Sequence, residues 1–121
     1  MILRAIREGL GRIIMAVDYL TRPKPMEREA QEQGAVDTAA AELSLYQFQA
    51  CPFCVKTRRA MHRLNVSIPL RDIRQSADHR KDLMEGGGST KVPCLRIEEG
   101  SETRWMYESN DIIRYLEERF V

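Results

Sequence analysis

The fold of this chain is decided by residues 43–64, LSLYQFQACPFCVKTRRAMHRL. Residues 43–48 form an apolar run of the kind found in strands, and residues 55–64 have the spacing of a helix. Cys51 and Cys54 therefore form a C-x-x-C pair at a strand-to-helix turn. A pair in this position indicates redox chemistry of the two thiols.

Cys51 is predicted to lie where a thiolate is favoured. Pro52 suits the first position of a helix, because the N–H that proline lacks has no intrahelical partner there. Cys51 then lies close to free backbone N–H groups and the positive end of the helix dipole. Cysteines of C-x-x-C motifs at helix starts have a pKa of roughly 3.5–7.5 instead of roughly 8.5. We predict that Cys51 is the nucleophile and that Cys54, one turn further on, resolves a mixed disulfide formed on Cys51.

Other uses of these cysteines are weaker. A tetrahedral zinc site needs a second Cys/His pair, and His62, His79 and Cys94 do not supply one, so no metal is expected. A structural disulfide across so short a loop restrains little of the unfolded chain. With 3 cysteines in 121 residues, the chain also does not look like a secreted disulfide scaffold. Cys94 is expected either to be a small buried side chain or to join the nearby redox chemistry.

The composition is that of one soluble globular domain, with 43% hydrophobic and 31% charged residues. The formal net charge of +1 gives no general attraction to nucleic acids or acidic partners. The sequence contains no basic patch interleaved with aromatic residues, so nucleic-acid binding is not expected.

Residues 1–20 form a separate amphipathic helix. Its apolar face contains Ile2, Leu3, Ile6, Leu10, Ile13, Ile14, Val17 and Leu20. Charges on the opposite face interrupt the run too often for a membrane-spanning helix or a secretory signal, so we expect a cytoplasmic protein. Basic residues outnumber acidic ones up to residue 25, which favours an anionic surface. The apolar face is expected to contact a membrane surface, the rest of the domain or a second copy of the chain.

Residues 21–42 are predicted to be a linker. Pro23 and Pro25 stop the first helix, and the polar, alanine-bearing stretch that follows can be partly helical. Residues 43–121 then alternate between strand and helix periodicity and form the third piece. The predicted elements are strands 43–48, 68–73, 94–98 and 103–107 and helices 52–65, 76–85 and 109–120. This βαβαββα order places the first two strands parallel and the last two in a hairpin, which is an α/β layer with helices on both faces.

Two motifs in this order carry a family resemblance. Cys51-Pro-Phe-Cys54 follows the first strand and Lys91-Val92-Pro93 precedes the third, so residues 43–121 resemble the glutaredoxin branch of the thioredoxin fold. The resemblance implies a four-stranded mixed sheet flanked by helices and a cis peptide between Val92 and Pro93. It also implies that Phe53, Val92 and Pro93 bind glutathione, with the Val92 backbone pairing with the cysteinyl unit and the Phe53 ring forming a wall of the groove.

The last helix departs from the usual glutaredoxin pattern. Glu108-Ser109 followed by Ile-Ile-Arg-Tyr-Leu116 is similar to the N-terminal domain of glutathione transferases. This resemblance implies that Glu108 and Ser109 hold the γ-glutamyl end of glutathione, with Glu108 accepting the ammonium group and Ser109 binding the carboxylate. The alternative is that Ser109 is only the N-cap of the last helix.

The resemblance implies a glutathione-dependent thiol–disulfide oxidoreductase that reduces mixed or protein disulfides through Cys51 and Cys54. Its expected partners are glutathione, as co-substrate, and disulfide-bonded or glutathionylated proteins. The alternative is a non-catalytic glutathione-binding or adaptor module, tethered at a membrane surface by residues 1–20. Conjugation of glutathione to electrophiles is not expected, because that reaction needs a helical second domain to build the second substrate pocket.

Overall fold

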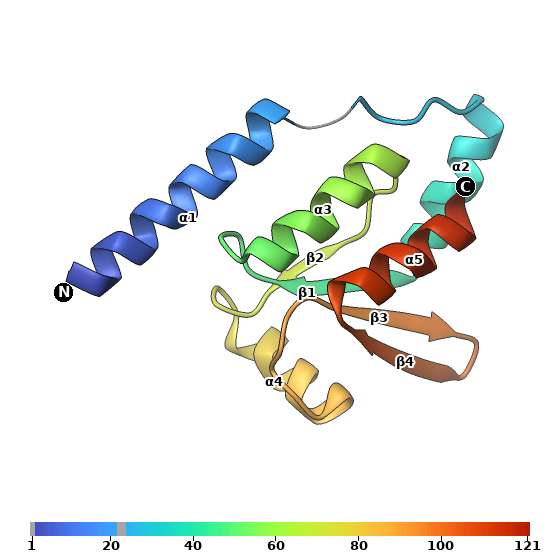
Figure 1. Ribbon diagram of the computed structural model, residues 1–121. Helices are drawn as coiled ribbons and strands as arrows, with labels where there is room; N and C mark the ends of the chain where they lie inside the picture. The colour runs from blue at the N-terminus through green and yellow to red at the C-terminus, as the bar shows by residue number, and fades with distance from the viewer. Residues whose placement is uncertain (1, 22–23) are drawn as a thin grey trace.

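The computed structural model describes residues 2–21 and 24–121 (Figure 1). Its helices are α1 (Ile2–Thr21), α2 (Ala30–Ala40), α3 (Pro52–Leu64), α4 (Ala77–Gly87) and α5 (Ser109–Phe120). Its strands are β1 (Leu43–Gln47), β2 (Leu70–Asp72), β3 (Cys94–Glu99) and β4 (Glu102–Tyr107). Every element predicted within residues 43–121 is confirmed, and the predicted amphipathic helix at the N-terminus is present as α1.

The strands form one mixed sheet in the order β2-β1-β3-β4. β1 pairs with β2 in parallel, with Leu45 opposite Leu70. β3 is antiparallel to both β1 and β4. The parallel pair connected through α3 and the terminal hairpin confirm the predicted topology.

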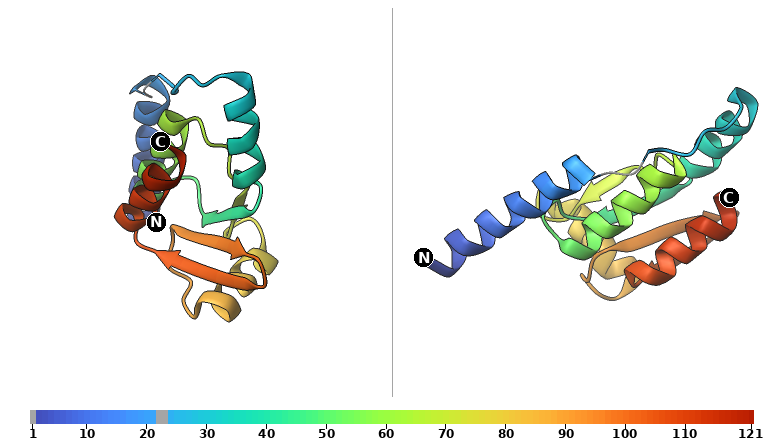
Figure 2. Two further views of the ribbon diagram at one scale, coloured as in Figure 1. Left: turned by 90° about the vertical axis from the view of Figure 1, so that its right-hand side faces the viewer. Right: turned by 45° about the horizontal axis from the view of Figure 1, so that its top comes forward.

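Helices cover both faces of the sheet, as Figures 1 and 2 show. On one face α3 and α5 bury the main core against alternate residues of β1 and β3. This core contains Leu43, Leu45, Met61, Leu64, Leu95, Ile97, Ile112, Leu116 and Phe120. On the other face Tyr46 and Cys94 pack with Leu83 of α4, and Trp105 and Tyr107 lie against this smaller cluster. Because successive side chains of a strand point to opposite faces of the sheet, the same strands contribute to a core on each face.

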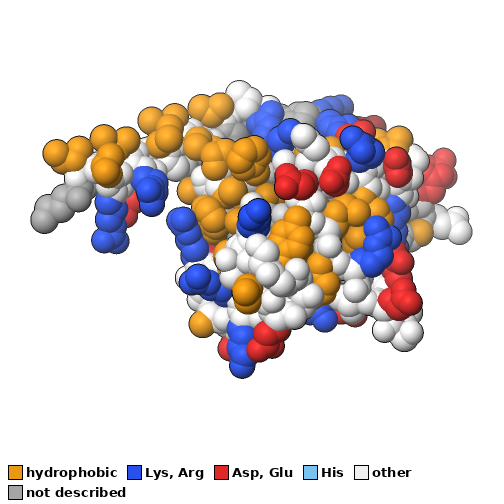
Figure 3. Space-filling view, turned by 60° about the horizontal axis from the view of Figure 1, so that its bottom comes forward, with side chains coloured by type: hydrophobic (Ala, Val, Ile, Leu, Met, Phe, Trp, Pro, Cys, Tyr) orange, Lys and Arg blue, Asp and Glu red, His pale blue; other side chains and the backbone are white. Residues whose placement is uncertain are grey.

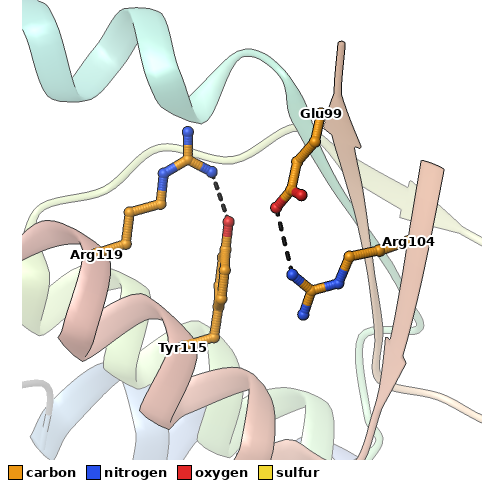
Figure 4. Close-up of polar contacts among 4 residues, drawn as sticks. All are labelled: Glu99, Arg104, Tyr115 and Arg119. Atoms are coloured by element: carbon orange, nitrogen blue, oxygen red, sulfur yellow. Dashed lines mark hydrogen bonds and ion pairs between the residues drawn. The ribbon is translucent and has the colours of Figure 1, made fainter. Parts of the chain in front are cut away.

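The β3–β4 hairpin closes at the end of the sheet away from the start of α3 (Figure 1). Gly100 has a φ of 62°, which suits a two-residue hairpin loop. Beside the turn, Arg104 Nη1 lies 3.3 Å from Glu99 Oε1, and Arg119 Nη1 donates to the Tyr115 hydroxyl at 2.6 Å (Figure 4). These exposed contacts each stabilise the fold by about 0–1 kcal/mol.

Residues 24–42 contain α2, which packs on the main core. Ala40 is fully buried, and Val36 and Ala39 lie against the core cluster. Ahead of α2, Arg28 Nη2 donates to the Phe120 carbonyl oxygen at 2.5 Å. The boundaries of the three predicted pieces remain predictions.

Helix α1 lies beside the start of α3 and is joined to the domain at two places. Gly11 is buried against Ala50, where a Cβ atom on Gly11 would be 2.8 Å from the Ala50 Cβ. Arg59 of α3 donates to the Thr21 hydroxyl at 2.9 Å and to the Thr21 carbonyl oxygen at 3.0 Å. Pro23, predicted to help stop this helix, lies outside the described residues.

The contact through Gly11 leaves most of the apolar face of α1 in solvent. Ile2, Ile6, Ile13, Val17 and Leu20 are 53–79% exposed. None of the described helices is both long and apolar enough to cross a membrane.

Helix α4 runs two residues beyond its predicted end. Gly86 and Gly87 continue the helix, and Gly88, with a φ of 84°, forms its C-cap. The reason is close packing against β4, because a Cβ atom on Gly86 would be 2.1 Å from Cζ2 of Trp105. The glycines therefore serve the packing of the last turn.

We expect Gly86→Ala to lower the free energy of unfolding by about 1–3 kcal/mol, because the added methyl group overpacks the site at Trp105. The matched control is Gly34→Ala within α2, where no atom lies within 4 Å of the new Cβ and alanine should stabilise the helix by up to about 1 kcal/mol. Urea unfolding measures both. Equal stabilisation by the two substitutions would contradict the packing explanation.

Candidate active site

Cys51 is the N-cap residue of α3. Its backbone is extended, with φ −70° and ψ 123°, and Pro52 occupies the start of the helix as predicted. The two thiols differ in exposure, since Cys51 is 7% exposed and Cys54 is completely buried. Both residues are therefore buried, and Cys54, one turn further along the helix, has no exposed surface at all.

Burial raises the pKa of the Cys54 thiol from 9.0 to about 12, and a hydrogen bond with Cys51 acts in the same direction. Cys54 is therefore protonated at neutral pH. Its S–H can donate to the sulfur of Cys51. This arrangement suits Cys51 as the nucleophile and Cys54 as a resolving thiol that reacts only after Cys51 has done so.

Arg58 of α3 holds the loop that leads from β1 to Cys51. Its guanidinium donates to Gln47 Oε1, to the Phe48 carbonyl oxygen at 3.4 Å and to the Gln49 carbonyl oxygen at 2.6 Å. Because one planar guanidinium makes all of these contacts, it fixes the geometry of the loop. Arg58 is thus a positioning residue for the active-site turn.

A cavity of about 320 Å³ lies beside this turn. It is lined by Phe53, Lys56, Lys91, Val92, Pro93, Tyr107, Glu108, Ser109 and Asn110. All five residues that the resemblance assigns to glutathione are in this set. Cys51 and Cys54 are not, although Phe53 lies between them in sequence.

The Val92–Pro93 peptide is cis, as the resemblance implies. Strand β3 begins only at Cys94, so the sheet does not use the backbone of Val92. The Val92 backbone is therefore placed at the cavity without a strand partner in the sheet.

Glu108, and not Ser109, is the N-cap of α5, so the alternative reading of Ser109 as the cap is wrong. Glu108 has a φ of 72°, which is rare for a residue with a side chain and costs of order 1–3 kcal/mol. Ser109 follows as the first helical residue and is buried. The free N–H groups of the first turn of α5, together with Lys56 and Lys91, make this wall of the cavity favourable for a carboxylate.

Sequence reasoning gave Lys91, Asn110 and Tyr107 no part in this cavity. Lys91 directly precedes Val92, and Asn110 directly follows Ser109, so adjacency to a motif was the available signal. Tyr107 packs against the smaller core cluster, its hydroxyl donates to the Ser89 carbonyl oxygen at 2.8 Å, and it also lines the cavity.

The three basic residues of the run after Cys54, Lys56, Arg58 and Arg59, make different contacts. Arg58 holds the active-site loop and Arg59 contacts Thr21. Lys56 Nζ lies 2.5 Å from Asn110 Oδ1, at the cavity. Of these three residues, only Lys56 lines the cavity.

Cys94 is completely buried on the α4 face of the sheet. Burial raises the pKa of its thiol to about 12. Within residues 2–21 and 24–121, no group of three or more His, Cys, Asp or Glu side chains is arranged to hold a metal ion.

Residues 50–119 match the model of the family described as glutathione S-transferase, N-terminal domain. The match spans more than half of the chain. The chain belongs to this family. The matched segment contains Cys51, Cys54 and every residue of the 320 Å³ cavity.

Solved structures of glutaredoxins are similar to this family member. Wheat glutaredoxin, known from a crystal structure, shares 18% sequence identity with this chain and has a TM-score of 0.50. The match covers 76% of this chain and 87% of the wheat chain. The solution structure of glutaredoxin from Brucella melitensis is 18% identical, covers 67% of this chain and 83% of its own, and has a TM-score of 0.45. Among curated proteins, no sequence matches. The likeness to wheat glutaredoxin supports the shared fold, which is the predicted thioredoxin-like one.

The raised pKa of Cys54 predicts slow alkylation. In a Cys51→Ser variant, we expect the rate of reaction of Cys54 with iodoacetamide to keep rising about tenfold per pH unit up to about pH 11, because only the thiolate reacts. Peptide mass spectrometry measures the rate at Cys54 separately from that at Cys94. N-acetylcysteine is the control and should level off above its pKa of about 8.5. A plateau for Cys54 near pH 9 would mean that its thiol is not buried as described.

Proposed function

We propose that this protein is a glutathione-dependent thiol–disulfide oxidoreductase that reduces mixed or protein disulfides through Cys51, with Cys54 as the resolving thiol. The observation that carries the proposal is the 320 Å³ cavity beside the first turn of α3, which gathers Phe53, Val92, Pro93, Glu108 and Ser109. These residues come from three separated stretches of sequence and meet only in the fold.

The charges of the cavity match those of glutathione. Glu108 can accept the ammonium group of the γ-glutamyl unit, and the N–H groups at the start of α5 can bind its carboxylate. Lys56 and Lys91 supply cations for the second carboxylate. The backbone of Val92 can pair with the cysteinyl unit in the manner of an added strand. Glutathione bound in this way extends toward Phe53 and the thiols.

The chemistry requires no group beyond the two thiols and glutathione. The Cys51 thiolate attacks the glutathione sulfur of a mixed disulfide, the substrate S–S bond breaks, and the substrate cysteine leaves as a thiolate that takes a proton from water. A second glutathione thiolate then attacks the Cys51–glutathione disulfide and releases oxidised glutathione and the Cys51 thiolate. With a protein disulfide, the Cys51 thiolate first attacks one of its sulfurs, the S–S bond breaks and Cys51 forms a mixed disulfide with the protein. Cys54 then gives its proton to water and attacks the Cys51 sulfur, which frees the reduced protein and leaves a Cys51–Cys54 disulfide. Two molecules of glutathione reduce this disulfide and leave as oxidised glutathione.

The test is turnover of a glutathione mixed disulfide in the presence of glutathione and glutathione reductase. We expect Cys51→Ser to reduce the rate to the uncatalysed background. Cys54→Ser should keep mixed-disulfide reduction within about threefold and lose most reduction of protein disulfides, because only the latter needs the second thiol. Cys94→Ser is the matched control and should change neither rate.

Two outcomes oppose this proposal. Turnover with thioredoxin reductase and none with glutathione would assign the protein to a different reductant. Absence of turnover in the unmodified protein, with glutathione still bound, would favour a non-catalytic glutathione-binding module.

A second proposal concerns α1, whose exposed apolar stripe favours contact with an anionic membrane surface. The stripe consists of Ile2, Ile6, Ile13, Val17 and Leu20, which are all more than half exposed although Ile13 and Val17 also lie beside Val55 of α3. A helix of this kind binds at the boundary between headgroups and acyl chains. Arg4, Arg7 and Arg12 add attraction to anionic lipids.

We expect the full chain to co-sediment with vesicles that contain phosphatidylserine, and Val17→Asp to weaken this binding by about tenfold, because a charge replaces an apolar contact. Val121→Asp is the matched control, since Val121 is also exposed but lies at the other end of the chain. If both variants and the unmodified chain sediment equally with the vesicles, the apolar stripe does not contribute to membrane binding.

A further inference from the structure

A second and larger cavity opens beside Cys51. It has a volume of about 1060 Å³ and lies between α1 and the turn that leads into α3. The domain side is lined by Phe48, Ala50, Cys51, Pro52 and Arg74. Figure 3 shows α1 as an arm beside the body of the molecule, with apolar side chains along its outer edge and Lys and Arg side chains in the hollow beneath it. We call this cavity the α1 cleft.

The α1 cleft is rich in arginine. Arg4, Arg7 and Arg12 line it from α1, and Arg74 lines it from the domain. Among the described residues that line it, Glu8 supplies the one carboxylate, which pairs with Arg4 at 3.2 Å. Within the described parts of the chain, Arg7 and Arg12 have no carboxylate at ion-pair distance. The cleft therefore presents uncompensated positive charge next to the thiol of Cys51.

The cleft also has apolar walls. Leu3, Leu10, Ile14 and Met15 line it from α1. On the domain side, the Arg74 guanidinium lies 3.7 Å from the centre of the Phe48 ring, so its charge is presented on an aromatic platform. A ligand with both carboxylates and apolar side chains suits such a surface.

We infer that the α1 cleft receives the polypeptide half of the disulfide substrate, as an extended segment with acidic residues beside its cysteine. This inference rests on the proposed function, because the chemistry of Cys51 is what brings the substrate there. The 320 Å³ cavity is the one assigned to glutathione, and about 1060 Å³ exceeds the usual size of a small-molecule pocket. Charge complementarity with Arg7, Arg12 and Arg74 selects an acidic segment.

The two cavities then divide one mixed disulfide between them. Its glutathione half lies beside Phe53, and its polypeptide half lies in the α1 cleft. The thiolate of Cys51 attacks the glutathione sulfur, the substrate S–S bond breaks, and the substrate cysteine departs as a thiolate into the cleft, where it takes a proton from water. The nearby arginines favour the negative charge on that leaving group.

The experiment compares three glutathionylated peptides of equal length, in which the residues flanking the cysteine are acidic, neutral or basic. We expect kcat/KM to be highest for the acidic peptide and lowest for the basic one. Arg7→Gln combined with Arg12→Gln should lower the acidic-to-basic ratio by about tenfold, the effect expected for two exposed charge pairs. The ratio should also fall toward one at 1 M salt, where the screening length is about 3 Å.

The matched control is Arg104→Gln combined with Arg119→Gln, which removes the same charge at the opposite end of the sheet (Figure 4). It should keep the acidic-to-basic ratio of the unmodified protein. A second pair tests the position of α1. Gly11→Ala displaces the helix from Ala50 and should lower the ratio, whereas Gly9→Ala, with no atom within 4 Å of its new Cβ, should not.

Fluorescence anisotropy of the acidic peptide, with serine in place of its cysteine, gives a readout that needs no turnover. Arginine-dependent binding without any turnover would contradict the proposed function and leave the cleft assignment supported. Turnover with equal rates for the three peptides would overturn the cleft assignment while the proposed function stands. An equal loss of the acidic-to-basic ratio in the Arg104 and Arg119 control would also overturn the cleft assignment. The same holds if the arginines of the cleft are needed for binding to anionic vesicles and the protein shows no preference among the peptides.

Discussion

The active site depends on the way β1 enters α3. Strand β1 lies between β2 and β3, so its direction is held on both sides. Arg58 then holds the carbonyl oxygens of Phe48 and Gln49, which leaves the loop little freedom. Cys51 follows with extended backbone and the helix begins at once. A single turn of helix therefore separates Cys51, at the N-cap, from the fully buried Cys54, whose thiol pKa is raised by burial.

The strand register brings the other parts of the site to the same place. Tyr46 of β1 lies opposite Cys94 of β3, and Cys94 lies opposite Tyr107 of β4. These three residues form a row across one end of the sheet. Next to this row along the chain lie the loop that leads from β1 to Cys51, the cis-bonded Pro93 before β3 and the strained Glu108 after β4. The cavity is therefore a consequence of antiparallel pairing, which joins segments that are distant in sequence, such as those of Tyr46 and Cys94.

Local periodicity was enough to predict the elements of residues 43–121, because each buries one face and ends at a recognisable turn such as that at Gly100. Features set by contacts distant in sequence were not predictable. The end of α4 depends on Trp105, which lies against Gly86 from another strand. The N-cap of α5 is Glu108, although its left-handed backbone conformation is one that sequence patterns assign to glycine or asparagine.

The position of α1 shows the same limit. From the sequence, Gly11 only weakens a helix, whereas in the fold its missing side chain lets α1 lie against Ala50. This contact fixes the rotation of α1 about its axis. With Gly11 inward, Arg7 and Arg12 line the cleft beside Cys51, together with Leu10 and Ile14. Ile13 and Val17 lie outside the cleft, beside Val55 of α3. A side chain at residue 11 would meet Ala50, so the close approach of α1 that forms one wall of the cleft beside Cys51 depends on this glycine.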